Sequence, residues 1–438
     1  MASLLENDNP QRVRARNRRL VLDEVWRSAP LTRSDLGASV GLAKSTIKEI
    51  CDGLIADGLL EEVAALRGSG RQGRPALQLK ISSQRGYLLG IDIGADKVIS
   101  RVATMAGETL ATVRTSTRKP SARHVLKVVR TTVESSLAEA GVTSDEILTT
   151  VVGTPGVVAP VTGIVTLAPQ IDGWEGIRLA SVIADALNLQ REHVAVERQT
   201  DLATLAEARY GAAKDAHCAV YVHLGIGIGG GIIIDGELYR GAAGAAGEIG
   251  YLPHSFGDMA PPRSGVGAWE WAAGGRAFAR HGREAAADSS GARLKELAGG
   301  RADQVSAKIV FTAAAEGDRT ALRLVRCLVH RIAVGIASVV CVLNPEYVIV
   351  AGGISRAGDP LVDLLEGELK NLVPVMPQVC LSSLADEGAV TGAIHRASTH
   401  TFDRLCPVDG GARAATAAVT EAAPPPQAQR TAPSAASQ

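Results

Sequence analysis

Apolar residues in the first eighty positions recur at the spacing of short helices. The pattern predicts helices over residues 17–27, 33–40 and 43–57, after a loose start over residues 1–11. Thr32 is a good N-cap for the second helix, and Gly41 permits a tight turn before the third. Two short helices joined by a turn of this kind form a helix-turn-helix.

A predicted hairpin follows these helices. Residues 59–63 and 76–81 are predicted strands, and the loop between them is rich in glycine and basic side chains. The loop carries Arg67, Arg71 and Arg74. Arginines on such a wing suit a narrow minor groove of DNA, where the negative potential is strong.

The third predicted helix would place its N-terminal residues at base edges in the major groove. Hydroxyl groups there can bond bases or phosphates, and lysines neutralise phosphates. An alternative is a small helical interaction module with a solvated basic loop. The candidate DNA-binding residues are Arg33, Lys44, Ser45, Thr46, Lys48, Arg71 and Arg74.

Strands and helices alternate over most of the remaining chain, which favours the α/β class. Strands are predicted over residues 86–92, 98–103, 147–153, 219–223, 232–234 and 347–351. Helices are predicted over residues 123–140, 320–343, 361–372 and 388–398. Residues 406–438 lack apolar periodicity and are rich in Ala, Pro, Ser, Thr and Gln, which predicts a disordered tail.

One glycine-rich stretch lies between two of the predicted strands. It holds Gly225, Gly227 and the run 229–231, and Asp235-Gly236 beyond it is a hairpin signal. Glycine lets the backbone approach a ligand closely, so that its N–H groups can face a phosphate or a sugar hydroxyl. The alternative is a tight glycine hairpin that only packs.

Composition adds little about partners. The 438 residues predict two or three domains, and 46 basic residues balance 46 acidic ones. Five arginines nevertheless gather without an acid between residues 12 and 19. Six scattered cysteines without CxxC spacing predict buried thiols of a cytoplasmic protein rather than a metal site or disulfides. No apolar run approaches the roughly twenty residues that span a membrane, so no membrane partner is expected.

The order of these motifs resembles the ROK family, which includes repressors and sugar kinases. Residues 244–250, Gly-Ala-Ala-Gly-Glu-Ile-Gly, resemble its signature, and residues 17–62 resemble the winged helix-turn-helix of its transcriptional regulators. The resemblance implies an α/β fold in which a winged helix-turn-helix precedes a two-lobed actin/hexokinase-like, ribonuclease-H-like ROK domain. The expected boundaries are 1–82 for the DNA-binding domain, 83–405 for the ROK domain and 406–438 for the tail.

The resemblance also implies an effector site between the lobes. Glu248 matches the family glutamate that holds sugar hydroxyls, and Glu270 matches one that reaches the sugar. Gln170 stands where the family commonly has a sugar-binding Asn. Gly225 and Gly227 belong to the family's second phosphate loop.

Residues needed for phosphoryl transfer are replaced in this sequence. Alignment on Glu197 and on Leu-Ala-Glu at 205–207 puts Gln199 at the position of the family's catalytic Asp and Arg198 at that of an Asn. A glutamine cannot accept the proton of the sugar hydroxyl. Asp96 and Ile226 also replace polar groups of the two phosphate loops. We therefore expect no catalytic residue and no enzymatic activity.

The zinc site of the family is replaced as well. Its ligand positions fall on Tyr251, Pro261, Arg263 and Ala268, none of which binds zinc in that way. We therefore expect neither a metal nor another cofactor.

Together these features predict a sequence-specific DNA-binding transcriptional regulator, with repression expected. Its ROK domain would sense a sugar or sugar phosphate and would assemble a homodimer or homotetramer on a double-stranded operator. Two alternatives stay open: an active sugar kinase with an attached DNA-binding domain, and a regulator that answers to a partner protein instead of a small ligand.

Overall fold

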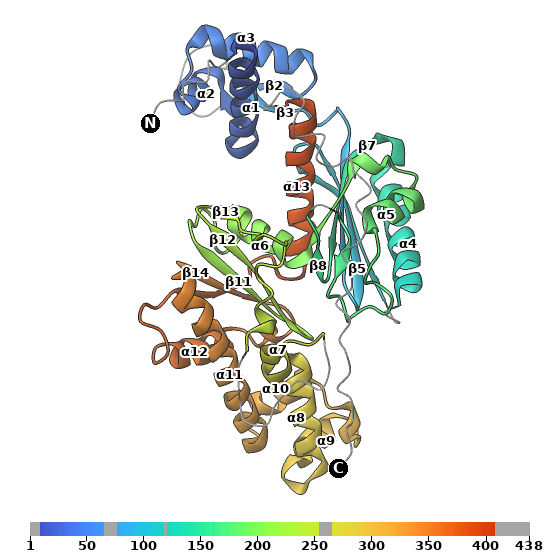
Figure 1. Cartoon of the computed structure of the whole chain (residues 1–438), viewed down its shortest axis with the longest axis vertical. Coiled ribbons are helices and arrows are strands. Elements are labelled where there is room, and N and C mark those ends of the chain that lie inside the picture. The colour runs from blue at the N-terminus through green and yellow to red at the C-terminus, as the bar shows by residue number, and fades with distance from the viewer. Residues whose placement is uncertain (1–8, 65–76, 118–120, 161, 254–264, 408–438) are drawn as a thin grey trace, which may run out of the picture.

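The computed structural model describes residues 9–64, 77–117, 121–160, 162–253 and 265–407, and the structural statements below concern these residues. An N-terminal helical unit is followed by two α/β lobes (Figure 1). The α/β class and the two-lobed architecture predicted from the sequence are confirmed.

The N-terminal unit is a winged helix-turn-helix. Its helices are α1 (Pro10–Ser28), α2 (Arg33–Val40) and α3 (Lys44–Ala56), and its sheet has the order β1 (Leu31–Thr32), β3 (Leu77–Ile81), β2 (Leu60–Ala64). Thr32 caps α2 in a capping box with Asp35, as its position predicts. Gly41 ends α2 at φ +69°, the left-handed conformation that a tight turn needs.

The predicted start of the first helix is wrong by seven residues. Helix α1 begins at Pro10 rather than at residue 17, so residues 10 and 11 are not loose. The Asn9 side chain accepts a hydrogen bond from the Gln11 N–H, and proline is well suited to the first helical turn. The many arginines in this segment concealed the helix because they weaken its apolar periodicity.

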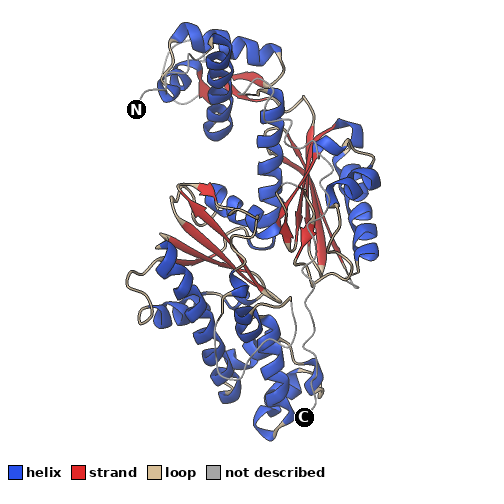
Figure 2. Ribbon diagram, viewed as in Figure 1, coloured by secondary structure: helices blue, strands red, loops and turns tan. Residues whose placement is uncertain are grey.

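The first lobe is a five-stranded sheet of order β10-β7-β4-β5-β6. Residues of β4 alternate between its two faces: Leu89 and Ile91 belong to the core beneath α4 (Ala122–Ala140), whereas Leu88 belongs to the cluster beneath α13 (Gly388–Leu405). Helices therefore cover both faces of this sheet (Figure 2). The strands are β4 (Tyr87–Ile93), β5 (Lys97–Thr104), β6 (Thr109–Ser116), β7 (Ile147–Thr154) and β10 (Val194–Arg198).

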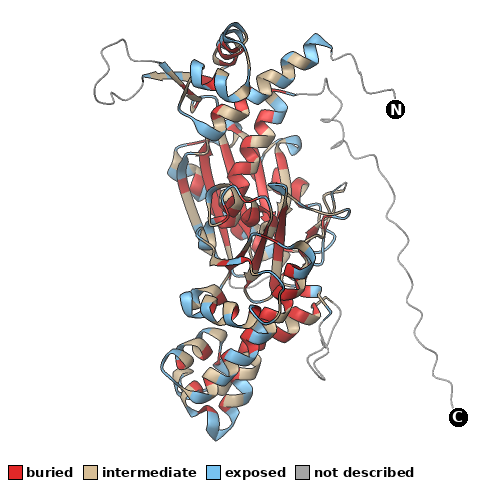
Figure 3. Ribbon diagram, turned by 90° about the vertical axis from the view of Figure 1, so that its left-hand side faces the viewer, coloured by how far each residue is buried: buried red, intermediate tan, exposed pale blue. Residues whose placement is uncertain are grey.

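The second lobe repeats this topology with the order β13-β12-β11-β14-β15. In both sheets the first strand pairs antiparallel with the second and parallel with the fourth, so the two lobes share one topology. The strands are β11 (Ala219–Leu224), β12 (Ile228–Ile234), β13 (Glu237–Leu238), β14 (Tyr347–Ala351) and β15 (Gln378–Leu381). Buried residues line both sheets (Figure 3).

Eight further helices and two short strands complete the lobes. They are α5 (Leu179–Leu187), α6 (Gln199–Tyr210), α7 (Ala268–Ala273), α8 (Gly275–Ala287), α9 (Ala292–Leu297), α10 (Ala307–Ala315), α11 (Arg319–Leu343), α12 (Asp359–Leu369), β8 (Val157–Val158) and β9 (Val165–Thr166). Helix α8 was not predicted from the sequence. Phe278 is the one large apolar side chain of this segment, and its other buried residues are Ala277, Gly282 and Ala286.

The glycine run at 229–231 lies within a strand and not in the predicted loop. Strand β12 begins at Ile228, so only Gly225, Ile226 and Gly227 turn between the strands. A Cβ on Gly231 would come within 2.1 Å of the Thr204 Oγ1 atom of α6. These glycines therefore let helix α6 lie directly against the sheet.

Two expectations that concern helix α11 (Arg319–Leu343) need correction. Helix α11 alone, among the described residues, is long and apolar enough to cross a membrane by length and composition, although no such segment was expected. More than half of its most apolar window is buried, and Leu328, Ile332 and Ile336 pack in the core of the second lobe. Cys327 and Cys341 lie on the exposed face of α11, so not every thiol is buried as predicted.

The core of the N-terminal unit includes side chains from the ROK domain. Phe402 and Cys406, at the end of α13, and Met105, after β5, are buried in the same cluster as residues of α1 and α3. The Trp26 ring of α1 lies 4.5 Å from the His395 ring and 5.6 Å from that of Phe402, centroid to centroid. Arg19 of α1 adds an ion pair with Asp403 at 2.5 Å. The winged helix-turn-helix is therefore packed firmly on α13.

Truncation of Phe402 tests this packing. We expect Phe402→Ala to lower the free energy of unfolding by about 3–5 kcal/mol, because it removes a large aromatic side chain that is fully buried between the two units. Urea unfolding followed by circular dichroism measures this loss. The matched control is Val342→Ala, since Val342 is 81% exposed, and it should change little. Equal effects of the two substitutions would contradict the packing described here.

Candidate functional site

A cleft of about 1300 Å³ separates the two lobes. We call it the interlobe cleft. It brings together all five of the predicted effector-binding residues and Gln199, and these six residues come from five different parts of the chain. These lining residues are Gln170, Gln199, Gly225, Gly227, Glu248 and Glu270.

Gln170 offers an unused acceptor to this cleft. Its Oε1 atom is buried and has no hydrogen-bond partner among the described residues. A buried carbonyl oxygen without a partner is unfavourable, so such an atom in a pocket indicates a ligand or a water molecule. The hydroxyl of a bound sugar would satisfy it.

Glu270 lies in the first turn of α7, against the glycine turn. Its carboxylate accepts the Ile228 N–H at 3.3 Å, and burial raises its pKa. A Cβ on Gly227 would come within 2.5 Å of its Oε2 atom, and one on Gly225 within 2.7 Å of the His223 ring. Both glycines are therefore required for packing, the alternative that the sequence left open, and they also line the cleft.

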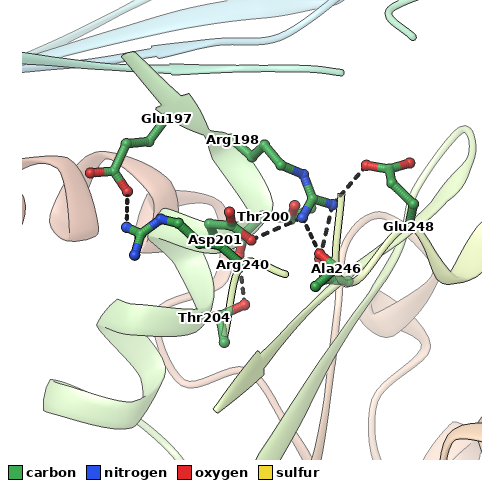
Figure 4. Close-up of polar contacts among 9 residues, drawn as sticks. Glu197, Arg198, Thr200, Asp201, Thr204, Arg240, Ala246 and Glu248 are labelled. Carbon is green, nitrogen blue, oxygen red and sulfur yellow. Dashed lines mark hydrogen bonds and ion pairs between the residues drawn. The ribbon is translucent and has the colours of Figure 1, made fainter. Parts of the chain in front are cut away.

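The Glu248 side chain is held by Arg198, which the sequence analysis described only as the replacement of a family asparagine. The Arg198 guanidinium donates to the Glu248 carboxylate at 2.7 Å (Figure 4). It also donates to Asp201 at 3.1 Å and to the carbonyl oxygen of Ala246. Arg198 ends β10 and its side chain is only 3% exposed. One oxygen of Glu248 is thereby fixed, while Glu248 still lines the cleft.

The same cluster contains a second buried carboxylate, Glu197. It pairs with Arg240 at 2.5 Å and with Arg396 of α13 at 2.7 Å. Burial alone would raise the pKa of Glu197, but Arg396, His400 and Arg240 hold it well below its usual range. Arg240 and Arg396 were not predicted as site residues, because they lie 43 and 199 positions from Glu197 and no local pattern connects them.

Asp201 completes the cluster on α6. Burial raises the pKa of Asp201 to about 6, although the charge of Arg198 lowers it. Burying a charge without a partner is strongly unfavourable, so the alternation of acidic and basic groups in this cluster is what permits its burial.

Helices α6 and α13 pack against each other between the two sheets, and α13 runs from the cleft to the N-terminal unit (Figure 1). Helix α6 begins at Gln199 in the cleft and ends at Tyr210, whose hydroxyl lies 2.8 Å from the His395 Nδ1 atom. Burial and Arg209 lower the pKa of His395 to about 3, so its ring is neutral beside Trp26. The cleft and the N-terminal unit are thus connected by packed helices.

The candidate DNA-binding residues divide into three groups. Lys44, Ser45 and Lys48 are exposed in the first turn of α3, and Thr46 is half-buried there. Arg33 is already paired with Asp52 at 2.8 Å and with Glu62. Arg71 and Arg74, with Arg67, lie outside the described residues. The predicted recognition turn is therefore accessible, whereas Arg33 is held in a network of ion pairs.

Comparison with known proteins identifies the family. The model described as "ROK family" matches residues 88–399, which is more than half of the chain. The chain belongs to the ROK family. It is 27% identical over 387 residues to a xylose repressor of Caldicellulosiruptor bescii, covering 86% of this chain and 94% of that one.

Two solved structures extend the comparison. A ROK family transcriptional regulator, a homologue of the E. coli MLC protein, superposes with a TM-score of 0.71 at 23% identity and covers 91% of this chain and all of its own. A ROK family glucokinase from Streptomyces griseus, in complex with glucose and AMPPNP, gives 0.61 at 28% identity and covers 72% of this chain and all of its own. The ROK fold is therefore shared with regulators and with kinases.

Two replaced family positions lie at the cleft. Gln199, at the position of the ROK kinase base, is the first residue of α6 and lines the cleft. The Tyr251 hydroxyl donates to the Gly265 carbonyl at 2.9 Å, and its ring also lines the cleft. Of the other zinc-ligand positions, Ala268 begins α7, and Pro261 and Arg263 lie outside the described residues. Within the described ranges, no group of three His, Cys, Asp or Glu could hold a metal ion.

The Arg198 cluster gives a stability prediction. We expect Arg198→Met to lower the free energy of unfolding by about 3–5 kcal/mol, because it leaves the carboxylates of Asp201 and Glu248 without their buried partner. Arg130→Met is the control, since Arg130 forms an exposed pair with Glu134 and should change stability by no more than about 0.5 kcal/mol. Urea titration of both variants measures the difference. Comparable losses would show that Arg198 does not hold this cluster together.

Proposed function

We propose that this protein is a DNA-binding transcriptional regulator, a repressor, whose interlobe cleft binds a sugar-type effector without phosphorylating it. The observation that carries the proposal is the position of α13, which begins at the cleft and ends in the core of the winged helix-turn-helix. A ligand that changes the cleft thus acts on a helix that the DNA-binding unit is packed on.

Two findings support DNA as the partner. The first turn of α3 presents Lys44, Ser45 and Lys48 to solvent, in the part of the motif that meets base edges and phosphates. Two xylose repressors match 86% and 82% of this chain, more than the region 88–399 of the family model. We propose a double-stranded operator read by a homodimer or homotetramer, because paired recognition helices require two half-sites.

The acceptor groups of the cleft support a polyhydroxylated effector. Gln170, Glu248 and Glu270 place a carbonyl and two carboxylates around one space, and sugar hydroxyls are suitable donors. The effector would shift the population between two lobe arrangements, and it can do so only if it binds one of them more tightly.

Gln199 supports sensing over catalysis. Phosphoryl transfer to a sugar needs a carboxylate that accepts the hydroxyl proton, and the amide of Gln199 cannot accept it. Glucokinases also match this chain, with 29% identity for the enzyme of Streptomyces coelicolor. The second candidate function is therefore a sugar kinase with an attached DNA-binding domain. Hexose-dependent ATP turnover by the purified protein would support that candidate.

DNA binding can be tested through its salt dependence. We expect the double substitution Lys44→Ala, Lys48→Ala to reduce the slope of log affinity against log salt by about two units, because each lysine neutralises about one phosphate. Fluorescence anisotropy on DNA from the region upstream of its own gene measures the slope. Lys127→Ala on α4, an exposed lysine remote from the N-terminal unit, should leave the slope unchanged. An unaltered slope in the double variant would remove α3 from the interface.

Effector binding can be tested by thermal melting with xylose, glucose and their phosphates. One of these ligands should raise the melting temperature of the wild type, since binding to the folded state alone stabilises by about 2.7 kcal/mol at a hundred times Kd. Glu270→Gln and Gln170→Leu should abolish the shift and preserve DNA binding, and the exposed Glu134→Gln should retain it. A shift that survives both cleft substitutions would place the ligand elsewhere, and no shift with any sugar would favour control by a partner protein.

A further inference from the structure

Helix α7 carries Glu270 into the interlobe cleft, although the helix is only six residues long. Isolated helices shorter than about twelve residues are marginal in water, so the helix propensity of this segment cannot hold it in place. The position of α7, and with it that of Glu270, therefore depends on contacts with the rest of the second lobe.

The first of these contacts is made by Trp269, which is fully buried. Its indole N–H donates to the backbone carbonyl of Arg331 in α11 at 3.0 Å. A Cβ on Gly335 would come within 1.9 Å of the indole ring, so the ring lies directly on the backbone of α11. Glycine destabilises the interior of a helix, and Gly335 lies well inside the 25 residues of α11. The ring of Trp269 accounts for a glycine at this place.

Two arginines hold the C-terminal end of α7. Arg331 donates to the carbonyl of Ala272 at 3.3 Å, and Arg280 of α8 donates to that of Trp271 at 3.0 Å. Carbonyls in the last turn of a helix lack partners within the helix and form the negative end of its dipole, so cations stabilise them. The Arg280 guanidinium also lies over the Trp271 ring, 3.9 Å from its centroid, in a cation–π contact.

The guanidinium of Arg280 is kept there against unfavourable electrostatics. Burial lowers the pKa of Arg280, and the charges of Arg331 and Arg283 lower it further, whereas Glu284 raises it. A cation in such a place needs compensating partners. The ring and the carbonyl of Trp271 supply them, so Arg280 and α7 stabilise each other.

These contacts determine where the Glu270 carboxylate lies against the glycine turn. It accepts the Ile228 N–H at 3.3 Å, and a Cβ on Gly227 would come within 2.5 Å of its Oε2 atom. A shift of α7 by about 1 Å would break the hydrogen bond or press the carboxylate into the turn, and binding groups tolerate displacements of only about 0.5 Å. The support of α7 is therefore also the support of a cleft residue.

The zinc-ligand positions of the family do not fit this supporting role in the present chain. The Tyr251 hydroxyl is already engaged with the Gly265 carbonyl at 2.9 Å, and Ala268 offers only a methyl group at the start of α7. Pro261 and Arg263 lie outside the described residues, and neither side chain is of a type that holds zinc in proteins. Zinc of the family type therefore does not fit these residues.

We propose that Trp269, Arg280 and Arg331 are positioning residues that hold α7, and with it Glu270, in place of the zinc ion of the family. Together with Gly335 they form what we call the α7 clamp. The use of Glu270 as an effector ligand rests on the proposed function, whereas the clamp itself does not.

Hydrogen exchange of the full chain, followed by mass spectrometry, tests the clamp without any ligand. We expect Arg280→Met to raise the exchange rates of residues 225–231 and 268–274 about tenfold, because a local opening that costs less is populated more often. Arg280→Lys keeps the charge and one donor, and it should retain most of the protection. Residues 87–104 of the first lobe should exchange as in the wild type in both variants.

Two further variants complete this experiment. Gly335→Ala leaves every hydrogen-bonding group in place and displaces only the Trp269 ring, and it should have the same local effect as Arg280→Met. The matched control is Arg326→Met, since Arg326 is an exposed arginine of α11, and it should change nothing. The proposal is overturned if Arg280→Met leaves residues 268–274 protected, or if exchange rises equally in both lobes.

Chelation tests the replacement of zinc. We expect EDTA to leave the exchange of residues 268–274 and the melting temperature of the wild type unchanged, because the clamp consists of protein groups alone. Metal analysis of the same samples gives the zinc content before and after treatment. A zinc ion whose removal raises the exchange of residues 268–274 would show that metal still holds α7.

The consequence for the effector has its own measurement. For a sugar that raises the melting temperature of the wild type, Arg280→Met should weaken the affinity about tenfold or more, since a misplacement of about 1 Å can cost up to a hundredfold. Arg280→Lys should restore most of the affinity. If exchange changes as expected and the affinity does not, the clamp stands and Glu270 is not an effector ligand. If no sugar binds, the proposed function fails, and hydrogen exchange still decides the clamp.

Discussion

The burial of Phe402 and its neighbours in the winged helix-turn-helix is the contact on which the rest of the account depends. Without it the N-terminal unit would be attached only through the chain between β3 and β4, and events in the cleft would have no packed route to it. With it, α13 contacts three parts of the molecule: the edge of the cleft, the first sheet and the N-terminal unit. A packed core does not deform continuously, so such a helix can carry a change from one end to the other.

Under the proposed function, the cluster at the start of α6 adapts a kinase-like cleft to ligand binding without catalysis. Arg198 replaces a family asparagine and Gln199 a family aspartate, and the sequence presents both as losses. In the structure, Arg198 fixes Glu248 and Asp201, and Glu197 next to it reaches Arg396 on α13. Ion pairs therefore connect this side of the cleft to α13, the helix that ends in the core of the N-terminal unit. Buried ion pairs add little net stability, but they fix a geometry when every partner is present.

Much of the fold could be predicted from local signals. Thr32, Gly41 and the apolar stripe of α3 define the helix-turn-helix, and six of the ten strands in the two five-stranded sheets were predicted from short apolar runs, whereas β6, β10, β13 and β15 were not. The predicted effector residues do meet in one cleft, because their family motifs lie at loops that this fold brings together. Prediction failed where the cause was not local. The glycines at 229–231 look like a loop, and only the fold shows that Thr200 and Thr204 of α6 lie against Gly229 and Gly231.

The ion pairs were beyond prediction for the same reason. No local sequence pattern links Glu197 to Arg396 or Lys97 to Asp386, because the two partners of each pair are separated by most of the ROK domain. Only the fold places these charges together. Arg33 shows the converse case: its position favoured a contact with DNA, but Asp52 and Glu62 already engage it.

The most direct test of the central claim, that the cleft and the DNA-binding unit are coupled, is a measurement of reciprocity. The affinity of the effector sugar is determined with and without saturating operator DNA, and the affinity for DNA with and without saturating sugar. Coupling through α13 requires both affinities to change by the same factor, because linkage between two binding sites is symmetrical. Two ligands that bind with affinities independent of each other would contradict the account.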